Sequence, residues 1–201
     1  MMTYEELKKK CPAQKLRDDA VMTGVVRLSF PHLFTPNTNP DLSNYGKYSC
    51  GLIANEDAED TMQLLGDLIN GAVERGKETA WKGKKDPKLD TERIVELKSE
   101  QQIDGDKWSI RSTAKEKPFR KVFDIKGNDI TGEDERIYGG AYARAILRCY
   151  PWGNSGKYGV SFIIEGIQIL EGGEPYGDAI DVKAAFGIDG VADITADEDE
   201  Y

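Results

Sequence analysis

Aromatic and basic side chains alternate along residues 142–150, and they share one face if this segment is a β-strand. Tyr142, Arg144, Arg148 and Tyr150 would point to one side of it, because successive side chains of a strand point to opposite sides. The intervening residues are small or apolar and suit packing on a core. Rings on which bases stack, with cations beside them, are what an unpaired nucleic-acid strand requires. The pattern therefore favours a nucleic-acid-binding face. An ordinary exposed strand whose rings pack on a neighbouring layer has the same pattern.

Other aromatic and basic residues could extend this face. Trp152 lies in a Pro-Trp-Gly turn, where core packing does not readily explain an exposed ring. Tyr48 and Trp108 lie in predicted strands and are also candidates for the core. Trp81, between a predicted helix and a lysine-rich loop, fits either a cap on the core or a stacking surface. Further cations that could meet phosphates are Lys47, Arg111, Lys115, Lys117, Arg120 and Lys157.

Catalytic and metal-binding patterns are absent or incomplete in the sequence. Residues 71–78 come close to a phosphate-binding loop, but Glu78 stands where a Ser or Thr should reach magnesium, and the stretch continues a helix. Residues 124–135 are acidic, but their glycine and carboxylates do not fall at calcium-loop positions. One histidine, His32, and three scattered cysteines do not make a recognisable zinc site. We therefore expect no enzyme activity, no metal and no other cofactor.

Charge is distributed unevenly along the 201 residues. The formal net charge is −9, yet the last nine residues hold five carboxylate side chains and no base, which leaves −4 on the rest. Basic residues cluster at positions 77–88 and 111–121. The chain therefore resembles a body with basic patches and a separate acidic tail. No membrane-spanning run and no signal-peptide pattern is visible, and the cysteines suit reduced thiols in a cytosolic setting.

The elements expected to position these residues are mostly strands. Hydrophobic patterning predicts strands at residues 24–30, 47–53, 107–113, 119–125, 137–150 and 157–170. In the first of them, Val26, Leu28 and Phe30 are expected to face inward and Arg27 and Ser29 outward. A long prolyl loop separates the first two strands. Strands at irregular spacing with one inserted helix predict a mainly β fold, a five- to six-stranded Greek-key barrel with long loops.

Two helices are expected. Apolar residues recur at helical spacing over residues 56–76, with Asn55 as a candidate N-cap. A short helix near the N-terminus would begin at Thr3, with Glu6 completing a capping box. We expect an N-terminal extension at residues 1–21, one domain at 22–190, and a flexible acidic tail at 191–201.

Residues 137–178 resemble the C-terminal half of a family of phage- and prophage-encoded single-stranded-DNA-binding proteins. The resemblance lies in an aromatic-Gly lead, a strand ending in Tyr-Pro-aromatic, a Gly-Lys turn, and a strand closing in Ile-Gln before an acidic-Gly turn and Glu-Pro. The Gly-Val-Val-Arg-Leu-Ser-Phe strand, Lys-Tyr-Ser and Asp-Gly-Asp before Trp108 agree more loosely, so the resemblance covers most of residues 22–178. The sequence departs from the family at residues 162–167, where FIIEGI replaces a Gly-Leu-Asn-Asn-like run.

The resemblance implies an OB fold and sequence-independent binding of single-stranded DNA in phage replication or recombination. It also implies a regulatory acidic tail ending in an aromatic residue, which here comprises Asp197, Glu198, Asp199, Glu200 and Tyr201. Such a tail could compete with DNA or recruit replication or recombination proteins, in the cytoplasm of a bacterial host. The sequence leaves open whether the protein forms a homodimer. The alternative is a non-catalytic interaction module that binds an acidic protein or a structured RNA, because fold alone does not give function.

Overall fold

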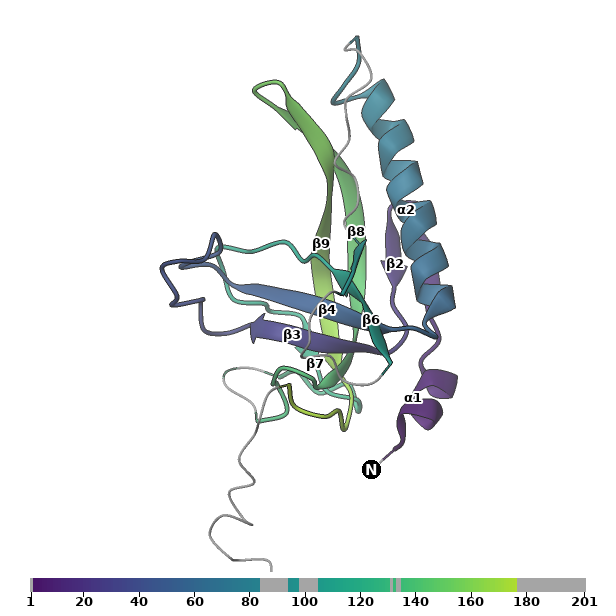
Figure 1. Cartoon of the computed structure of the whole chain (residues 1–201), viewed down its shortest axis with the longest axis vertical. Coiled ribbons are helices and arrows are strands. Elements are labelled where there is room, and N and C mark those ends of the chain that lie inside the picture. Colours follow the sequence, from purple (N-terminus) through teal and green to yellow (C-terminus); the bar gives the residue numbers. More distant parts are fainter. Residues whose placement is uncertain (1, 84–93, 98–104, 131, 133–134, 177–201) are drawn as a thin grey trace, which may run out of the picture.

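The computed structural model describes residues 2–83, 94–97, 105–130, 132 and 135–176. These residues form two helices and nine strands (Figure 1). The helices are α1 (Tyr4–Lys10) and α2 (Glu59–Glu78). The strands are β1 (Gln14–Arg17), β2 (Ala20–Met22), β3 (Val26–His32), β4 (Ser49–Asn55), β5 (Ile94–Glu96), β6 (Asp106–Ile110), β7 (Val122–Phe123), β8 (Tyr142–Asn154) and β9 (Lys157–Ile169).

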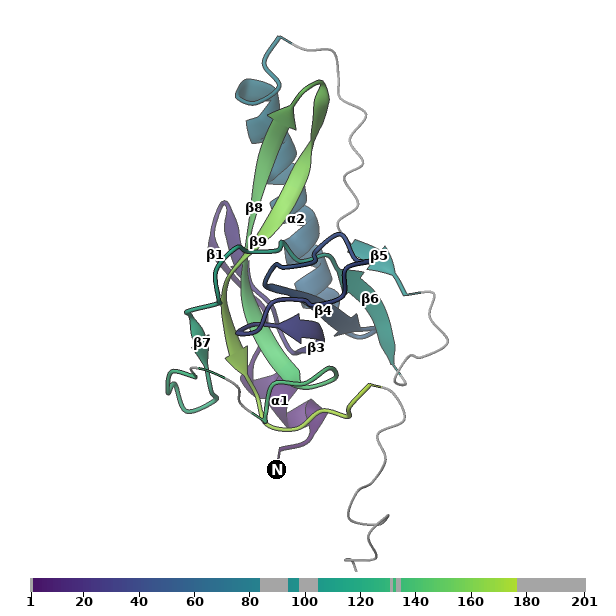
Figure 2. The same cartoon turned by 90° about the vertical axis from the view of Figure 1, so that its left-hand side faces the viewer.

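The strands belong to one sheet, in which a path runs β1-β2-β8-β3-β4-β6-β5 and β9 pairs with β8 and β7. Every pairing is antiparallel except the parallel pairing of β7 with β9. β8 and β9 form a hairpin that extends far beyond β3 and β4 (Figure 1). Figure 2 shows β1 and β7 on one side of this hairpin and β5 and β6 on the other. The long hairpin is therefore the central element of the sheet.

The six predicted strands correspond to β3, β4, β6, β7, β8 and β9, and the mainly β architecture is confirmed. The structure adds β1, β2 and β5. The boundary expected at residue 22 falls inside β2, which pairs with β8, so β1 and β2 are part of the sheet and not an extension. The sequence did not reveal β2 because it is three residues long and its partner lies more than a hundred residues away.

The N-terminal helix forms as predicted. Thr3 Oγ1 accepts a hydrogen bond from Glu6 N at 3.3 Å, and the Glu6 carboxylate accepts one from Thr3 N at 2.9 Å. Leu7 is fully buried in a small cluster with Cys11, Val25 and Leu170. This helix therefore covers one end of the sheet and links both ends of the described chain.

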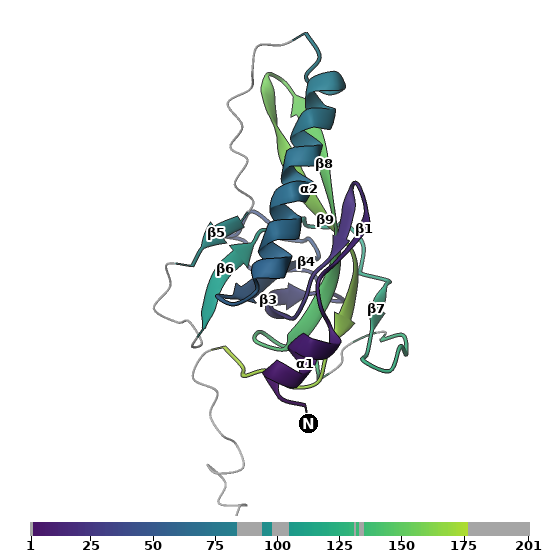
Figure 3. The same ribbon diagram turned by 90° about the vertical axis from the view of Figure 1, so that its right-hand side faces the viewer.

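The second helix begins three residues later than expected and extends to Glu78. The prediction of Asn55 as its N-cap is wrong, since Asn55 ends β4 and its side chain accepts from Asp57 N at 3.2 Å in a turn before the helix. The helix runs along the β8–β9 hairpin (Figure 3). Its buried residues include Leu65, Leu68 and Ala72. No helix among the described residues is both long and apolar enough to span a membrane.

The first predicted strand shows a further difference. Val26 and Leu28 are buried as expected, but Phe30 is 81% exposed, so the expectation that it faces inward is wrong. The cause is a β-bulge between Ser29 and His32, which inserts one extra residue in β3 relative to β4. Arg27 lies on the outer face as expected, yet it is buried there by the surrounding chain. The alternation of residues in the sequence reveals neither the burial of Arg27 nor the bulge in β3.

Candidate nucleic-acid interface

The predicted alternation along β8 is confirmed. Ala143, Ala145, Leu147 and Cys149 are buried, whereas the residues between them are partly exposed. Residues directly opposite each other in an antiparallel pair share a face. The pairs Arg148–Ile163, Tyr150–Ser161, Trp152–Gly159 and Asn154–Lys157 therefore line the face that points away from the buried residues. We call this surface the hairpin face, and its functional candidates are Arg144, Arg148, Tyr150, Trp152 and Lys157.

Glycines and one buried tryptophan fix the aromatic end of the hairpin face. A Cβ atom on Gly159 would lie 2.9 Å from Trp152 Cζ2, so the missing side chain lets the indole ring lie across β9. Trp81 is buried, and its Nε1 donates a hydrogen bond to the Trp152 carbonyl at 2.9 Å. Trp81 thus packs in the core and ties the hairpin to the end of α2, which resolves the two alternatives for this residue.

The arginines of the hairpin face already have polar partners. Arg144 Nε donates to Gln168 Oε1 at 2.6 Å. Arg148 donates from Nε to Asp19 Oδ2 at 3.1 Å and from Nη1 to Glu165 Oε1 at 3.4 Å. These partners hold the guanidinium groups in place above the strands. A phosphate that approaches Arg148 meets a positioned cation, but it competes with two carboxylates.

Two adjoining clefts run along the hairpin face. Their cavity volumes are ≈ 290 Å³ and ≈ 440 Å³, and both are lined by Lys121, Ile146 and Glu165. β1 contributes Arg17 to one wall, and β7 contributes Phe123 to the other. Sequence reasoning missed Arg17. Nothing in this short polar segment indicates that β1 pairs with β2, which in turn pairs with β8. Lys121 belongs to the basic cluster noted in the sequence, yet its place beside β9 depends on the β7–β9 pairing.

Residues 115–121, which we call the basic segment, lie beside these clefts. Lys117 and Arg120 are exposed, and the Lys115 ammonium lies 4.8 Å from the centroid of the Phe119 ring. Burial lowers the pKa of Lys115, and neighbouring Glu165 opposes this effect. The segment therefore brings cations to the edge of the hairpin face near the carboxylate that binds Arg148.

Several predicted residues lie elsewhere. The Tyr142 ring packs against Tyr4, with centroids 5.6 Å apart, and against the Arg27 guanidinium carbon, 4.7 Å from its centroid. The faces of the Tyr142 ring are thus covered by other side chains of the protein. The prediction that Tyr142 offers a stacking surface for bases is therefore wrong. Tyr48 and Trp108 are partly buried and pack against the core, in agreement with the core alternative.

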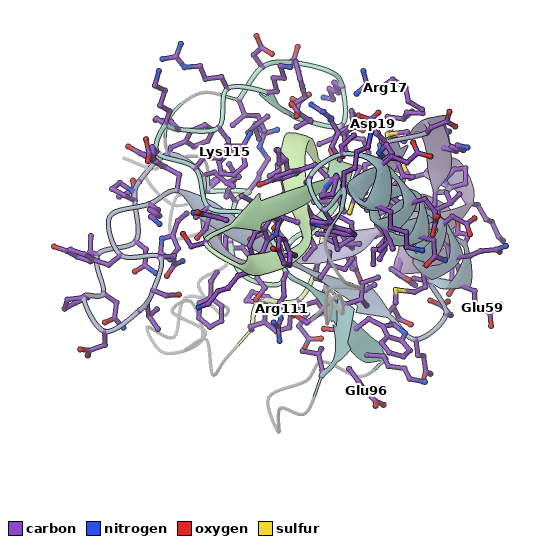
Figure 4. All side chains as sticks on the ribbon, turned by 90° about the horizontal axis from the view of Figure 1, so that it is seen from above. Arg17, Asp19, Glu59, Glu96, Arg111 and Lys115 are labelled. Atoms are coloured by element: carbon purple, nitrogen blue, oxygen red, sulfur yellow. The ribbon has the colours of Figure 1, made fainter. Side chains whose placement is uncertain are left out.

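The remaining predicted residues divide between two surfaces and the undescribed tail. Arg111 is exposed, and Figure 4 shows it on the opposite side of the hairpin from Lys115, Arg17 and Asp19. Lys47 is exposed in the connection between β3 and β4. The acidic tail and the domain boundary at residue 190 lie outside the described residues. No cluster of His, Cys, Asp and Glu that could hold a metal ion occurs among the residues described.

Comparison with known proteins decides the family. The model of a family described as Enterobacter phage Enc34, ssDNA-binding protein, matches residues 19–200. The chain belongs to this family. A phage homologue, the putative protein p50 of Acyrthosiphon pisum secondary endosymbiont phage 1, is 26% identical over 165 residues, which cover 75% of this chain and 83% of that protein. The resemblance predicted from residues 137–178 is therefore confirmed.

Solved structures of phage proteins share the fold. The single-stranded DNA-binding protein from bacteriophage Enc34 in complex with ssDNA has a TM-score of 0.62 and 19% identity, covering 83% of this chain and 98% of that chain. The crystal structure of gp2.5, a single-stranded DNA binding protein encoded by bacteriophage T7, has a TM-score of 0.50 and 16% identity, covering 81% of this chain and 96% of that chain. At these identities the likeness supports the OB fold of the family.

Proposed function

We propose that this protein binds single-stranded DNA without sequence preference, as a non-catalytic component of phage DNA replication or recombination. The observation that carries the proposal is the hairpin face, where Tyr150 and Trp152 stand in line with Arg148 and Arg144 on one strand. Family membership supports the same function. The solved structure of a related protein, from bacteriophage Enc34, is a complex with ssDNA.

In this mechanism, bases of an unpaired strand stack on Tyr150 and Trp152, and phosphates bind the cations along β8 and its flanks. Stacking of this kind contributes about 1–3 kcal/mol per base and tolerates every base, because each has a π-face. Arg144, Arg148 and Lys157 supply charge along the hairpin. Duplex DNA buries its base faces in the helical stack and leaves none free for Tyr150 and Trp152, so it should bind much more weakly.

A set of ring and charge variants tests the hairpin face. Trp152→Ala should weaken binding of labelled poly-dT about tenfold in fluorescence anisotropy, whereas Trp152→Phe retains a ring and should lose much less. Arg148→Ala should weaken binding and make the dependence on salt less steep. Lys9→Ala removes an equal charge from α1, away from the hairpin, and serves as the matched control. Equal binding by all four variants would rule out this face.

The acidic tail has a proposed role that rests on its sequence alone. A run of carboxylates ending in Tyr201 resembles a single strand in charge and in its terminal ring, so it could compete for the same cations. Once DNA displaces it, its charge could recruit replication or recombination proteins. Deletion of residues 193–201 should raise DNA affinity, most at low salt, because salt screens such competition. Unchanged affinity at low salt would remove the competition.

A further inference from the structure

Near the end of β3, Phe30 exposes its aromatic ring, and its backbone has a conformation that a bulky residue rarely adopts. Phe30 is the most exposed of the large hydrophobic side chains in the described chain, at 81%, and its φ is +45°. Such backbone conformations are unfavourable for a non-glycine residue and cluster at functional sites. The core closes without it, since Leu33 and Cys50 are buried next to the bulge. The fold thus holds this ring in solvent against local preference.

The connection that follows β3 adds a second exposed ring on a hydrogen-bonded loop. Tyr45 is exposed, and the loop around it is held by backbone bonds from Asn37 N to Lys47 O at 3.0 Å and from Gly46 N to Asn37 O at 2.8 Å. The Asn37 side chain is buried and donates to Asn44 Oδ1 at 2.8 Å. The Tyr45 ring is therefore presented from a hydrogen-bonded loop.

The basic segment connects this region to the hairpin face. Lys115 exchanges backbone hydrogen bonds with Tyr48, which ends the connection, and Phe119 N donates to Leu33 O at 3.0 Å near its start. At the other end of the segment, Lys121 lines both clefts of the hairpin face together with Glu165, the partner of Arg148. The segment carries four cations and one carboxylate, a net charge of +3.

We propose that Phe30, with Tyr45, forms a second base-stacking station, which a single strand reaches from the hairpin face across the basic segment. This inference rests on the proposed function and extends its binding path. The alternating order of rings, cations and rings favours a nucleic acid over an apolar partner. Exposed rings also mediate self-association. The test must therefore distinguish binding of DNA at these rings from binding of a second copy of the chain.

The experiment uses labelled oligo-dT of two lengths, about 6 and about 16 nucleotides, within the range of site sizes for one OB fold. Phe30→Ala should weaken binding of the longer oligonucleotide about tenfold and leave the shorter one unchanged. Trp152→Ala should weaken both. Phe30→Tyr keeps a ring and should bind as the wild type does. Leu42→Ala removes exposed apolar surface without a ring from the same connection, and it should also have no effect.

Three outcomes would count against these proposals. Wild-type affinity of Phe30→Ala for the longer oligonucleotide would overturn the second station and leave the hairpin face intact. Phe30→Ala could change only the mass of the protein in sedimentation and not its affinity for DNA. This result would assign the ring to contacts between copies of the chain, and would also overturn the second station. Absence of binding by the wild type to either oligonucleotide would overturn the proposed function itself.

Discussion

Arg148 on β8 donates to the Glu165 carboxylate on β9, with an Nη1–Oε1 distance of 3.4 Å, and both side chains remain partly exposed. Asp19 binds the same guanidinium from the β1–β2 turn at 3.1 Å. The central cation of the hairpin face is thus positioned by carboxylates of the protein. A phosphate bound there would have to displace or share these partners, so the two carboxylates should oppose phosphate binding.

Glu165→Gln should therefore raise affinity for single-stranded DNA several-fold, most at low salt, because it removes a charge that repels phosphate and competes for Arg148. Anisotropy titrations at two salt concentrations measure the effect. Glu74→Gln removes a carboxylate from the exposed side of α2 and is the matched control. Weaker binding by Glu165→Gln would mean that Glu165 aids binding by holding Arg148 in place.

The ion pair between Arg27 and Asp106 should be important for stability. Their side chains are 11% and 1% exposed, the Nε–Oδ1 distance is 3.1 Å, and Tyr176 donates to the second carboxylate oxygen at 2.7 Å. Asp106→Ala leaves a buried guanidinium unpaired and should lower the free energy of unfolding by about 3–5 kcal/mol. Urea denaturation measures this. Asp18→Ala, at an exposed pair, should leave the free energy of unfolding nearly unchanged.

The turn at Asp124 should make the stability of the fold depend on pH in the acid range. Hydrogen bonds from the Asn128 side chain and backbone, and from Arg136 and Lys126 N, lower the pKa of Asp124 to about 2. Because the folded pKa lies below the unfolded value, the stabilisation is complete above the unfolded pKa and is lost as pH falls from about 4 towards 2. Thermal unfolding of Asp124→Asn should be less sensitive to pH in this window. An unchanged pH profile would contradict this role.

Phe30→Asn should stabilise the fold. Asparagine adopts left-handed backbone conformations more readily than phenylalanine, and the exposed ring contributes little packing. Relief of the strain should raise the free energy of unfolding by about 1 kcal/mol. Thermal and urea unfolding of the variant and the wild type give the value. A clear loss of stability would show that the ring supports the fold, and would weaken the case for a binding role.

Much of the fold follows from local patterns. The alternation of residues 142–150, the capping box at Thr3 and the order of six strands all depend on neighbours in sequence, and each is present in the structure. β2 and the burial of Arg27 depend on contacts between distant residues. The exposure of Phe30 depends on a one-residue bulge. Periodicity contains no information on such contacts.

The candidate site was predictable only in part, for the same reason. The sequence identified Arg148 and Tyr150 correctly as neighbours on one strand face. The placement of Trp152 in a turn is wrong, because β8 continues through it to Asn154. The sequence could not show that Tyr142 packs between Tyr4 and Arg27, because both partners come from remote segments. Composition could reveal a basic cluster but not its position beside β9.

The most direct test of the account is anisotropy of labelled poly-dT and a matched duplex over a series of salt concentrations. We expect strong dT binding, far weaker duplex binding, and a linear decrease of log affinity with log salt. Contacts to about five phosphates along the hairpin face and basic segment correspond to a slope of roughly −3 to −4. Equal affinity for both DNAs, or no dT binding at low salt even after removal of residues 193–201, would contradict the account.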